Sequence, residues 1–155
     1  MPPQETPRRA NGSTTTRPQA PATRNSWRSS ASSSSDAGSG LLRTYCGVAE
    51  TIGKKRTMED RSHCCRLGDG TIYAGVFDGH SGALAAEHAS ASLHSHLSGY
   101  TGATKDRFEA AFARCEAEIL GLGVRDGTTA CTAIVDAASA ELHVANLGDS
   151  RAVLG

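Results

Sequence analysis

Alternation of apolar and polar residues with a period of two, the pattern of a half-buried strand, begins after residue 43. It predicts strands in residues 44–50, 61–67 and 71–77, and the turn at 68–70 would make the last two neighbours. The pattern returns in residues 128–136 and 141–148, and residues 151–155 are predicted to begin a further strand. The chain therefore has two groups of strands separated by about 50 residues of different periodicity.

Those intervening residues repeat with a period of 3.6 and predict two helices. In residues 82–97 the first helix has a narrow stripe of small and apolar residues, suited to close packing, formed by Ala86, Ala89, Leu93 and Leu97. The second helix is predicted to have Thr104 as its N-cap. Its apolar face is predicted to consist of Phe108, Ala111, Phe112, Cys115, Ile119 and Leu122. We expect the two helices to pair antiparallel.

Strands, two helices and strands again indicate an α+β fold, in which antiparallel strands form a sheet under a helical layer. The 155 residues allow one domain. Residues 151–155 would leave an unpaired strand edge, which natural folds usually cover, and residues 44–155 contain no evident partner sheet. We therefore expect the sequence to be a fragment of a longer domain.

The first 43 residues differ from the rest in composition and charge. All 5 prolines lie within residues 1–21, and residues 1–43 carry a net charge of +4 against −4 for residues 44–155. With little apolar surface to offset the entropy of ordering, residues 1–43 are predicted to be a disordered tail. The tail has Trp27 as its one aromatic residue and no recognised nucleic-acid-binding fold, so we expect no nucleic-acid partner.

No run of residues is apolar enough for a secretory signal or a membrane span. We therefore expect an intracellular protein, cytoplasmic or nuclear, with no membrane span. The Arg- and Ser-rich, acid-poor residues 1–40 leave import into an organelle open as the alternative.

The 5 cysteines are an odd number without a C-x-x-C pair, which fits neither a disulfide framework nor a zinc site. We predict that they are reduced and mostly buried. Cys64 and Cys65 are neighbours in a predicted strand, so their side chains should point to opposite faces. Five histidines have no pairing on one helix face and are interpreted as surface or strand residues: His63, His88, His94, His96 and His143.

Acidic residues cluster at the ends of two predicted neighbouring strands, with Glu59 and Asp60 before one and Asp78 after the other. If these strands pair, the carboxylates converge, and their repulsion raises their pKa values unless cations bind. Mg²⁺ and Mn²⁺ suit such oxygen ligands, and the Gly79 carbonyl offers one more. His80 then lies beside the metals as a candidate general acid. The alternative is that Asp78-Gly79-His80 is a plain turn.

Four segments, "RTMED" (56–60), "YAGVFDGHSG" (73–82), "GTTACTAIV" (127–135) and "NLGDSRAVL" (146–154), resemble in order and spacing the metal-dependent serine/threonine protein phosphatases of type 2C. The resemblance implies an antiparallel β-sandwich flanked by antiparallel helix pairs, of which residues 44–155 are the N-terminal part. It also implies that a hydroxide activated by two Mn²⁺ or Mg²⁺ ions hydrolyses phosphoserine and phosphothreonine in proteins. The implied partners are phosphoprotein substrates, and the chain is expected to be monomeric.

The resemblance also assigns roles to single residues. Asp78 would bridge two metal ions, Asp60 would orient bound water, and His80 would be the general acid. The implied metal ligands are Glu59, Asp60, Asp78, the Gly79 carbonyl and, for a third and weaker ion, Asp149. For Asp149, a role as an ordinary turn residue stays open.

Three features depart from the family pattern. The phosphate-binding arginine of the family falls at Lys55, one residue before Arg56, so either Lys55 or a shifted Arg56 would bind phosphate, unless both lie in a solvated basic turn. Ser81 replaces a usual glycine, which is costly if that position needs a positive φ. The family's remaining aspartates would lie beyond Gly155, so we expect the 155-residue chain to bind metal poorly and to hydrolyse little. A catalytically inactive, phosphatase-like binding module is the alternative function.

Overall fold

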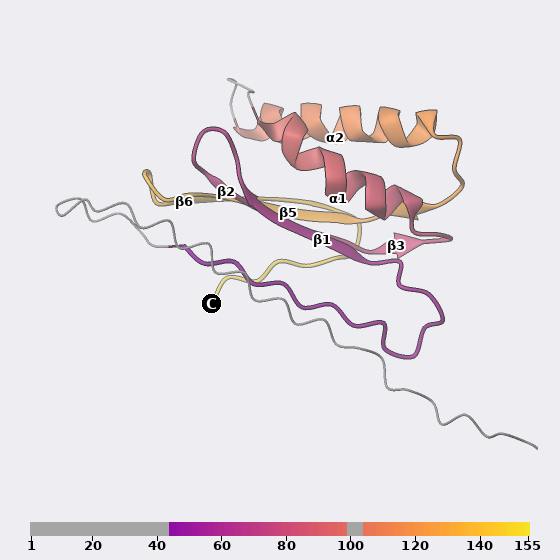
Figure 1. Ribbon diagram of the computed structural model, residues 1–155. Helices are drawn as coiled ribbons and strands as arrows, with labels where there is room; N and C mark the ends of the chain where they lie inside the picture. The colour runs from indigo at the N-terminus through magenta and orange to yellow at the C-terminus, as the bar shows by residue number, and fades with distance from the viewer. Residues whose placement is uncertain (1–43, 99–103) are drawn as a thin grey trace, which may run out of the picture.

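The computed structural model describes residues 44–98 and 104–155, which form a helical layer on one face of an antiparallel sheet (Figure 1). The predicted tail, residues 1–43, lies outside the described residues. Four strands form the sheet in the order β1-β2-β5-β6, with bounds Arg61–Arg66, Ile72–Phe77, Ala130–Asp136 and Glu141–Leu147. The short strands β3 (Gly79–His80) and β4 (Gly127–Thr128) pair separately. The α+β class is thus confirmed.

Helices α1 (Leu84–Leu97) and α2 (Thr104–Gly121) run in opposite directions across one face of the sheet (Figure 1). The stripe predicted for the first helix is buried along its whole length. On α2 the predicted apolar face joins the same core as far as Ile119. Leu122 is an error of the prediction, because α2 ends at Gly121 and leaves Leu122 exposed. Thr104 is the first helical residue rather than the cap before it.

Two histidines of α1 join the helices to each other. His88 and His96 donate hydrogen bonds to the same Glu118 carboxylate on α2, over 3.0 Å and 2.9 Å. These bonds lower the pKa of Glu118 from 4.5 to about 2. The interpretation of both histidines as surface residues is therefore wrong, since they connect two packed elements.

The two faces of the sheet differ in their surroundings. Tyr73, Phe77 and Ile134 face the helices and are buried, as the period of two requires. On the opposite face Val76 and Val144 are exposed. The described residues therefore supply one sheet of the expected sandwich together with its helix pair, and no second layer covers the other face within 44–98 and 104–155.

Two predicted strands are not strands in the structure. Residues 44–50 are extended but form a single bridge at Val48, and residues 151–155 form no regular structure. Both segments pass on the side of the sheet away from the helices (Figure 1). Their sequences favour extended backbone, but a strand also needs a neighbouring strand along its edge.

The cysteine prediction is partly wrong, because Cys46 and Cys64 form a disulfide. Cys64 and Cys65 do point to opposite faces, and Cys64 faces the open side along which residues 44–50 run. The sequence could not reveal the pair, since 18 residues separate the two cysteines. Cys65, Cys115 and Cys131 are free, and the last two are buried as expected.

Candidate active site

Asp60 and Asp78 lie at the same end of the β1–β2 pair, where Arg61 is opposite Phe77. Burial and the Asp78 charge, in that order, raise the pKa of Asp60, while the nearby Lys55 ammonium acts against them. Asp60 Oδ1 is buried and has no hydrogen-bond partner among the described residues. The predicted convergence of acids is therefore confirmed for this pair.

The position of Glu59 is fixed by close packing against Gly79. A Cβ atom at Gly79 would lie 2.4 Å from the Glu59 carbonyl oxygen and 3.2 Å from Ala86 Cβ. Only glycine fits such an approach of two backbones. The structure thus gives a packing reason for this glycine, besides the carbonyl ligand that the sequence suggests.

Arg61 holds the acidic segment from the side of β1, a role that the sequence analysis missed. Its guanidinium donates to the carbonyl oxygens of Met58 and Asp60 over 2.9 Å and 2.8 Å. The same side chain forms an ion pair with Glu87 on α1. Because three partners orient one guanidinium, Arg61 fixes the backbone on both sides of Glu59.

His80 lies on β3 and is exposed to solvent. Its cross-strand partner is Gly127 of β4, and a Cβ atom there would lie 2.5 Å from His80 Nε2. The imidazole therefore lies against the bare backbone of Gly127. This contact orients the imidazole, which follows Asp78 by two residues in the chain.

The chain turns from β3 into α1 through strained backbone. Ser81 has a φ of 62°, in the left-handed region. This position therefore does need a positive φ, and a serine there costs more free energy than the usual glycine. Gly82 follows with a φ of 144° and packs against Asp126. The Asp126 carboxylate accepts a hydrogen bond from the Ala85 amide over 3.1 Å and so caps α1 from a distant part of the chain.

Thr129 joins Asp78 to the loop that carries Asp149. The Asp78 amide donates to Thr129 Oγ1 over 3.0 Å, and the Thr129 amide donates to the Asp78 carbonyl over 2.9 Å. Thr129 Oγ1 also shares a hydrogen bond of 2.6 Å with the Ser150 hydroxyl. Asp149 is therefore next to Ser150, which reaches the Asp78 backbone only through Thr129, and the Asp149 carboxylate has no ion pair among the described residues. Thr129 belongs to the segment "GTTACTAIV", but the sequence analysis assigned no role to it.

The two basic candidates differ in their placement. The carbonyl of Ile52 accepts the Lys55 amide over 3.2 Å, which closes a turn before the acids. Lys55 lies close enough to Asp60 to lower its pKa. Arg56 forms no ion pair with another described residue. The structure thus brings Lys55, rather than Arg56, to the carboxylates.

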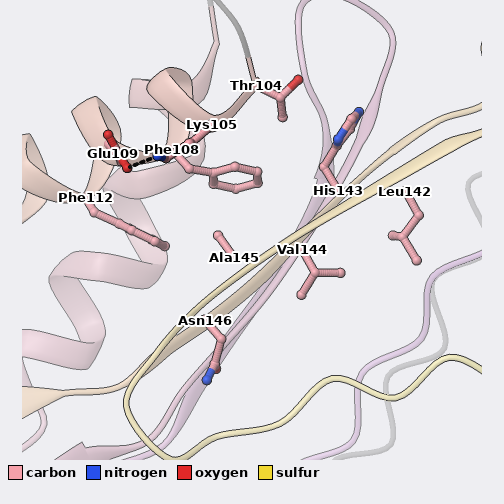
Figure 2. Close-up of a pocket in the computed structure, with 10 residues that line it drawn as sticks. All are labelled: Thr104, Lys105, Phe108, Glu109, Phe112, Leu142, His143, Val144, Ala145 and Asn146. Atoms are coloured by element: carbon pink, nitrogen blue, oxygen red, sulfur yellow. Dashed lines mark ion pairs between the residues drawn. The ribbon is translucent and has the colours of Figure 1, made fainter.

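A groove of about 500 Å³ lies elsewhere, between α2 and the edge strand β6 (Figure 2). Phe108 and Phe112 form one wall, and Ala145, on the helix-facing side of β6, lies on the other. None of the site residues predicted from the sequence lines it. The candidate chemistry is therefore at the open end of the β1–β2 pair and not in this groove.

The residues at that end fit a hard divalent cation. Two close carboxyl groups, one with a buried oxygen that lacks a donor, repel each other unless a cation balances them. Carboxylate and carbonyl oxygens are the ligands that Mg²⁺ and Mn²⁺ prefer. The structure thus brings two carboxylates together at the end of the sheet, here called the carboxylate centre, and no third acidic side chain among the described residues joins them closely enough to form a group of three ligands.

Comparison with known proteins assigns the family. The family model for Protein phosphatase 2C matches residues 45–155, and the chain belongs to this family. It is 38% identical over 117 residues to Probable protein phosphatase 2C 14 of Arabidopsis thaliana, covering 70% of this chain and 26% of that protein. It is 32% identical over 163 residues to Probable protein phosphatase 2C 56 of Oryza sativa subsp. japonica, covering 98% and 44%. The chain therefore spans less than half the length of these relatives.

A solved structure titled "Structure of a C.elegans sex determining protein" covers 54% of this chain and 25% of its own, with 19% identity and a TM-score of 0.48. No helix among the described residues combines the length and the apolar composition needed to cross a membrane.

Proposed function

We propose that this chain contributes part of the centre of a protein phosphatase that hydrolyses phosphoserine and phosphothreonine in proteins with the aid of Mn²⁺ or Mg²⁺. The observation that carries the proposal is the Asp60–Asp78 pair, whose charges converge at one sheet end with a buried, unpartnered oxygen. Two repelling carboxylates destabilise a fold, so their presence favours a role in holding cations over a role in binding a partner protein.

Asp78, Asp60, Glu59 and the Gly79 carbonyl are the residues that would hold two ions, with Asp149 available to a third. Bound there, the ions would supply an activated water as the nucleophile and neutralise charge on the phosphate. Arg61 and Thr129 orient the backbone of these ligands. Both residues would act by positioning the ligands before substrate binds, because their hydrogen bonds go to backbone atoms.

His80 would protonate the leaving oxygen of the serine or threonine side chain. It is exposed and lies against Gly127, and histidine is the side chain that most often serves as a general acid. General acid catalysis of this kind contributes typically about 10²- to 10⁴-fold in rate. Lys55 would attract the phosphate as a point charge, which gives less geometric control than a bidentate arginine.

The test uses the product of the complete transcript, with phosphate release from a phosphothreonine peptide measured against Mn²⁺ concentration. We expect Mn²⁺-dependent turnover that Asp78→Asn abolishes and His80→Ala lowers. The matched control is Glu141→Gln, which removes an exposed acid away from the site and should keep the turnover. For the 155-residue chain alone we expect little turnover and poor Mn²⁺ binding. Absence of turnover in the complete product, with its acids intact, would support the binding-module alternative instead.

A further inference from the structure

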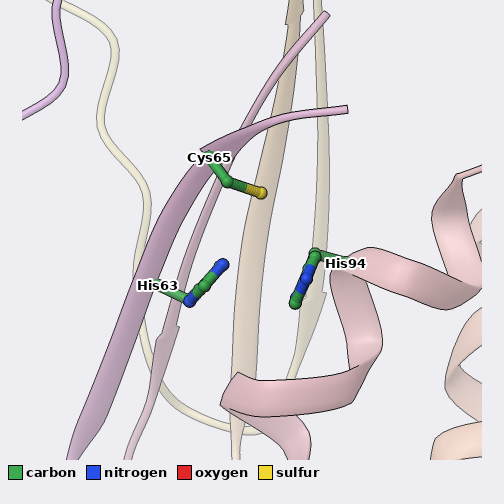
Figure 3. A group of neighbouring side chains, drawn as sticks. All are labelled: His63, Cys65 and His94. Carbon is green, nitrogen blue, oxygen red and sulfur yellow. The ribbon is translucent and has the colours of Figure 1, made fainter. Parts of the chain in front are cut away.

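A second group of ligand-type side chains lies on the helix-facing side of β1, away from the acids. His63 and Cys65 are alternate residues of β1, so they point to the same face, and His94 lies on the side of α1 that covers that face (Figure 3). One candidate ligand atom from each residue lies within 4.8 Å of the other two. The three side chains converge in the space between β1 and α1 (Figure 3).

Polar atoms in this group lack partners. His63 Nε2 and His94 Nδ1 are buried and have no hydrogen-bond partner among the described residues. The two imidazole rings stack with their centroids 4.3 Å apart. Buried polar groups are normally satisfied, and each one that is not costs free energy. A single ligand at the edge of both rings, where the nitrogen lone pairs lie in the ring planes, would satisfy both nitrogens at once.

The protonation states favour a cation as that ligand. Burial, followed by the neighbouring His63, lowers the pKa of His94, which keeps its imidazole neutral with a lone pair available. Burial raises the pKa of the Cys65 thiol, so the thiol is protonated until a metal displaces its proton to solvent. Burial also raises the pKa of Tyr73, whose hydroxyl has no described partner. Tyr73 therefore remains a neutral donor and not a ligand.

We infer that His63, Cys65 and His94 form a binding site for one zinc-type divalent cation, separate from the carboxylate centre. Two imidazoles and a thiolate are a donor set that zinc prefers, whereas Mn²⁺ and Mg²⁺ prefer oxygen. Bonds of about 2.0–2.3 Å to a tetrahedral ion require ligand atoms about 3.5 Å apart. The candidate ligand atoms lie within 4.8 Å of one another, so binding requires the stacked rings to turn until both nitrogens face the ion, and water would take the fourth position.

The site has a structural consequence for the fold. His63 and Cys65 belong to the edge strand of the sheet, and His94 belongs to the helix that covers it. A cation held by all three would connect the two layers. Its binding should therefore raise the stability of the chain as well as change its spectrum.

Co²⁺ is the probe that tests the inference, because thiolate ligation gives a charge-transfer band that oxygen ligands do not give. We expect the 155-residue chain, with its disulfide intact, to develop this band with one equivalent of Co²⁺, and Zn²⁺ to abolish it. Cys65→Ser and His94→Gln should each lose the band and the Zn²⁺-induced rise in the thermal midpoint. Cys131→Ser removes another buried thiol, and Tyr73→Phe removes the neighbouring hydroxyl, and both should keep the band.

A missing band in the unaltered chain overturns the inference, as does a band that survives Cys65→Ser or disappears with Cys131→Ser. Far-ultraviolet circular dichroism identifies any variant that fails to fold, and His94→Gln then serves in place of Cys65→Ser. Asp78→Asn should keep the band, since its oxygen ligand lies outside this group. The result is therefore independent of the proposed phosphatase function.

Discussion

Replacing Ser81 with glycine should stabilise the protein. Ser81 is exposed and has a φ of 62°, where the Cβ atom of an L-residue crowds the following carbonyl oxygen. That conformation costs about 1–2 kcal/mol for a non-glycine residue. Glycine avoids the cost but gives the unfolded chain more freedom, which returns about 0.4–1 kcal/mol. The expected gain in the free energy of unfolding is therefore about 0.5–1 kcal/mol.

Urea unfolding of the 155-residue chain, followed by circular dichroism, measures this gain. With a slope of about 2 kcal/mol per molar urea, the midpoint should rise by about 0.3–0.5 M without a change in slope. The Ser81→Gly variant adds no contact to the folded state, so the whole gain would come from relieved backbone strain. The side chain of Ser81 has no hydrogen bond among the described residues that the substitution would remove.

Two matched variants separate this cause from a general effect of glycine. Ala140 is also exposed with a positive φ, 56°, in the turn between β5 and β6, so Ala140→Gly should raise the midpoint in the same way. Ser98, at the end of α1, has a φ of −71° and donates its hydroxyl to the His94 carbonyl oxygen over 3.1 Å, so Ser98→Gly should lower the midpoint. The strain argument is refuted if Ser81→Gly leaves the midpoint unchanged while Ala140→Gly raises it.

Three further predictions concern charges described above. Asp126→Ala removes the remote cap of α1 and should cost about 1 kcal/mol in urea unfolding, most of which Asp126→Asn should retain. Glu118→Gln should lower the free energy of unfolding at pH 7. This loss should shrink as the pH falls from 4.5 to about 2, because a carboxyl group with a lowered pKa in the folded state contributes its full stability above its unfolded pKa and loses it towards its folded pKa. Thermal unfolding of both proteins at several pH values measures the difference. Asp60→Asn should raise the urea midpoint at neutral pH without divalent ions, since it removes a partly buried charge beside Asp78. An unchanged or lower midpoint for Asp60→Asn would contradict the repulsion on which the site is built.

The sequence predicted the elements whose pattern depends on one local environment. Helix α1 and strand β2 each have one face against the core. Their apolar residues therefore repeat with periods of 3.6 and two, and these repeats are visible in the sequence. Residues 44–50 have the same alternation but no neighbour to complete a ladder. Whether an extended segment pairs with another strand depends on residues far away in the sequence, and a local pattern of apolar residues carries no information about them.

The candidate site follows the same division. The proximity of Asp60 and Asp78 could be predicted from the sequence, because a short turn fixes the register of β1 against β2. Thr129 could not be found in this way, since 51 residues separate it from Asp78 and the segment "GTTACTAIV" that contains it does not show which of its residues contacts Asp78. The Cys46–Cys64 pair and the His63–His94 stack were missed for the same reason, because each joins elements that only the fold brings together.

The hydrogen bonds of Thr129 also bear on the order in which the molecule folds. They connect the end of β2 to the loop after β6 through partners 51 and 21 residues away in sequence. Contacts that close such long loops form after local ones, because the loop entropy must be overcome first. Pairing β2 with β5 closes a loop of similar length, so the Thr129 contacts form together with that pairing and after the local β1–β2 hairpin that brings Asp60 to Asp78. A cation held by Asp60 and Asp78 would therefore stabilise the hairpin, a part of the sheet whose strands are joined by a short loop.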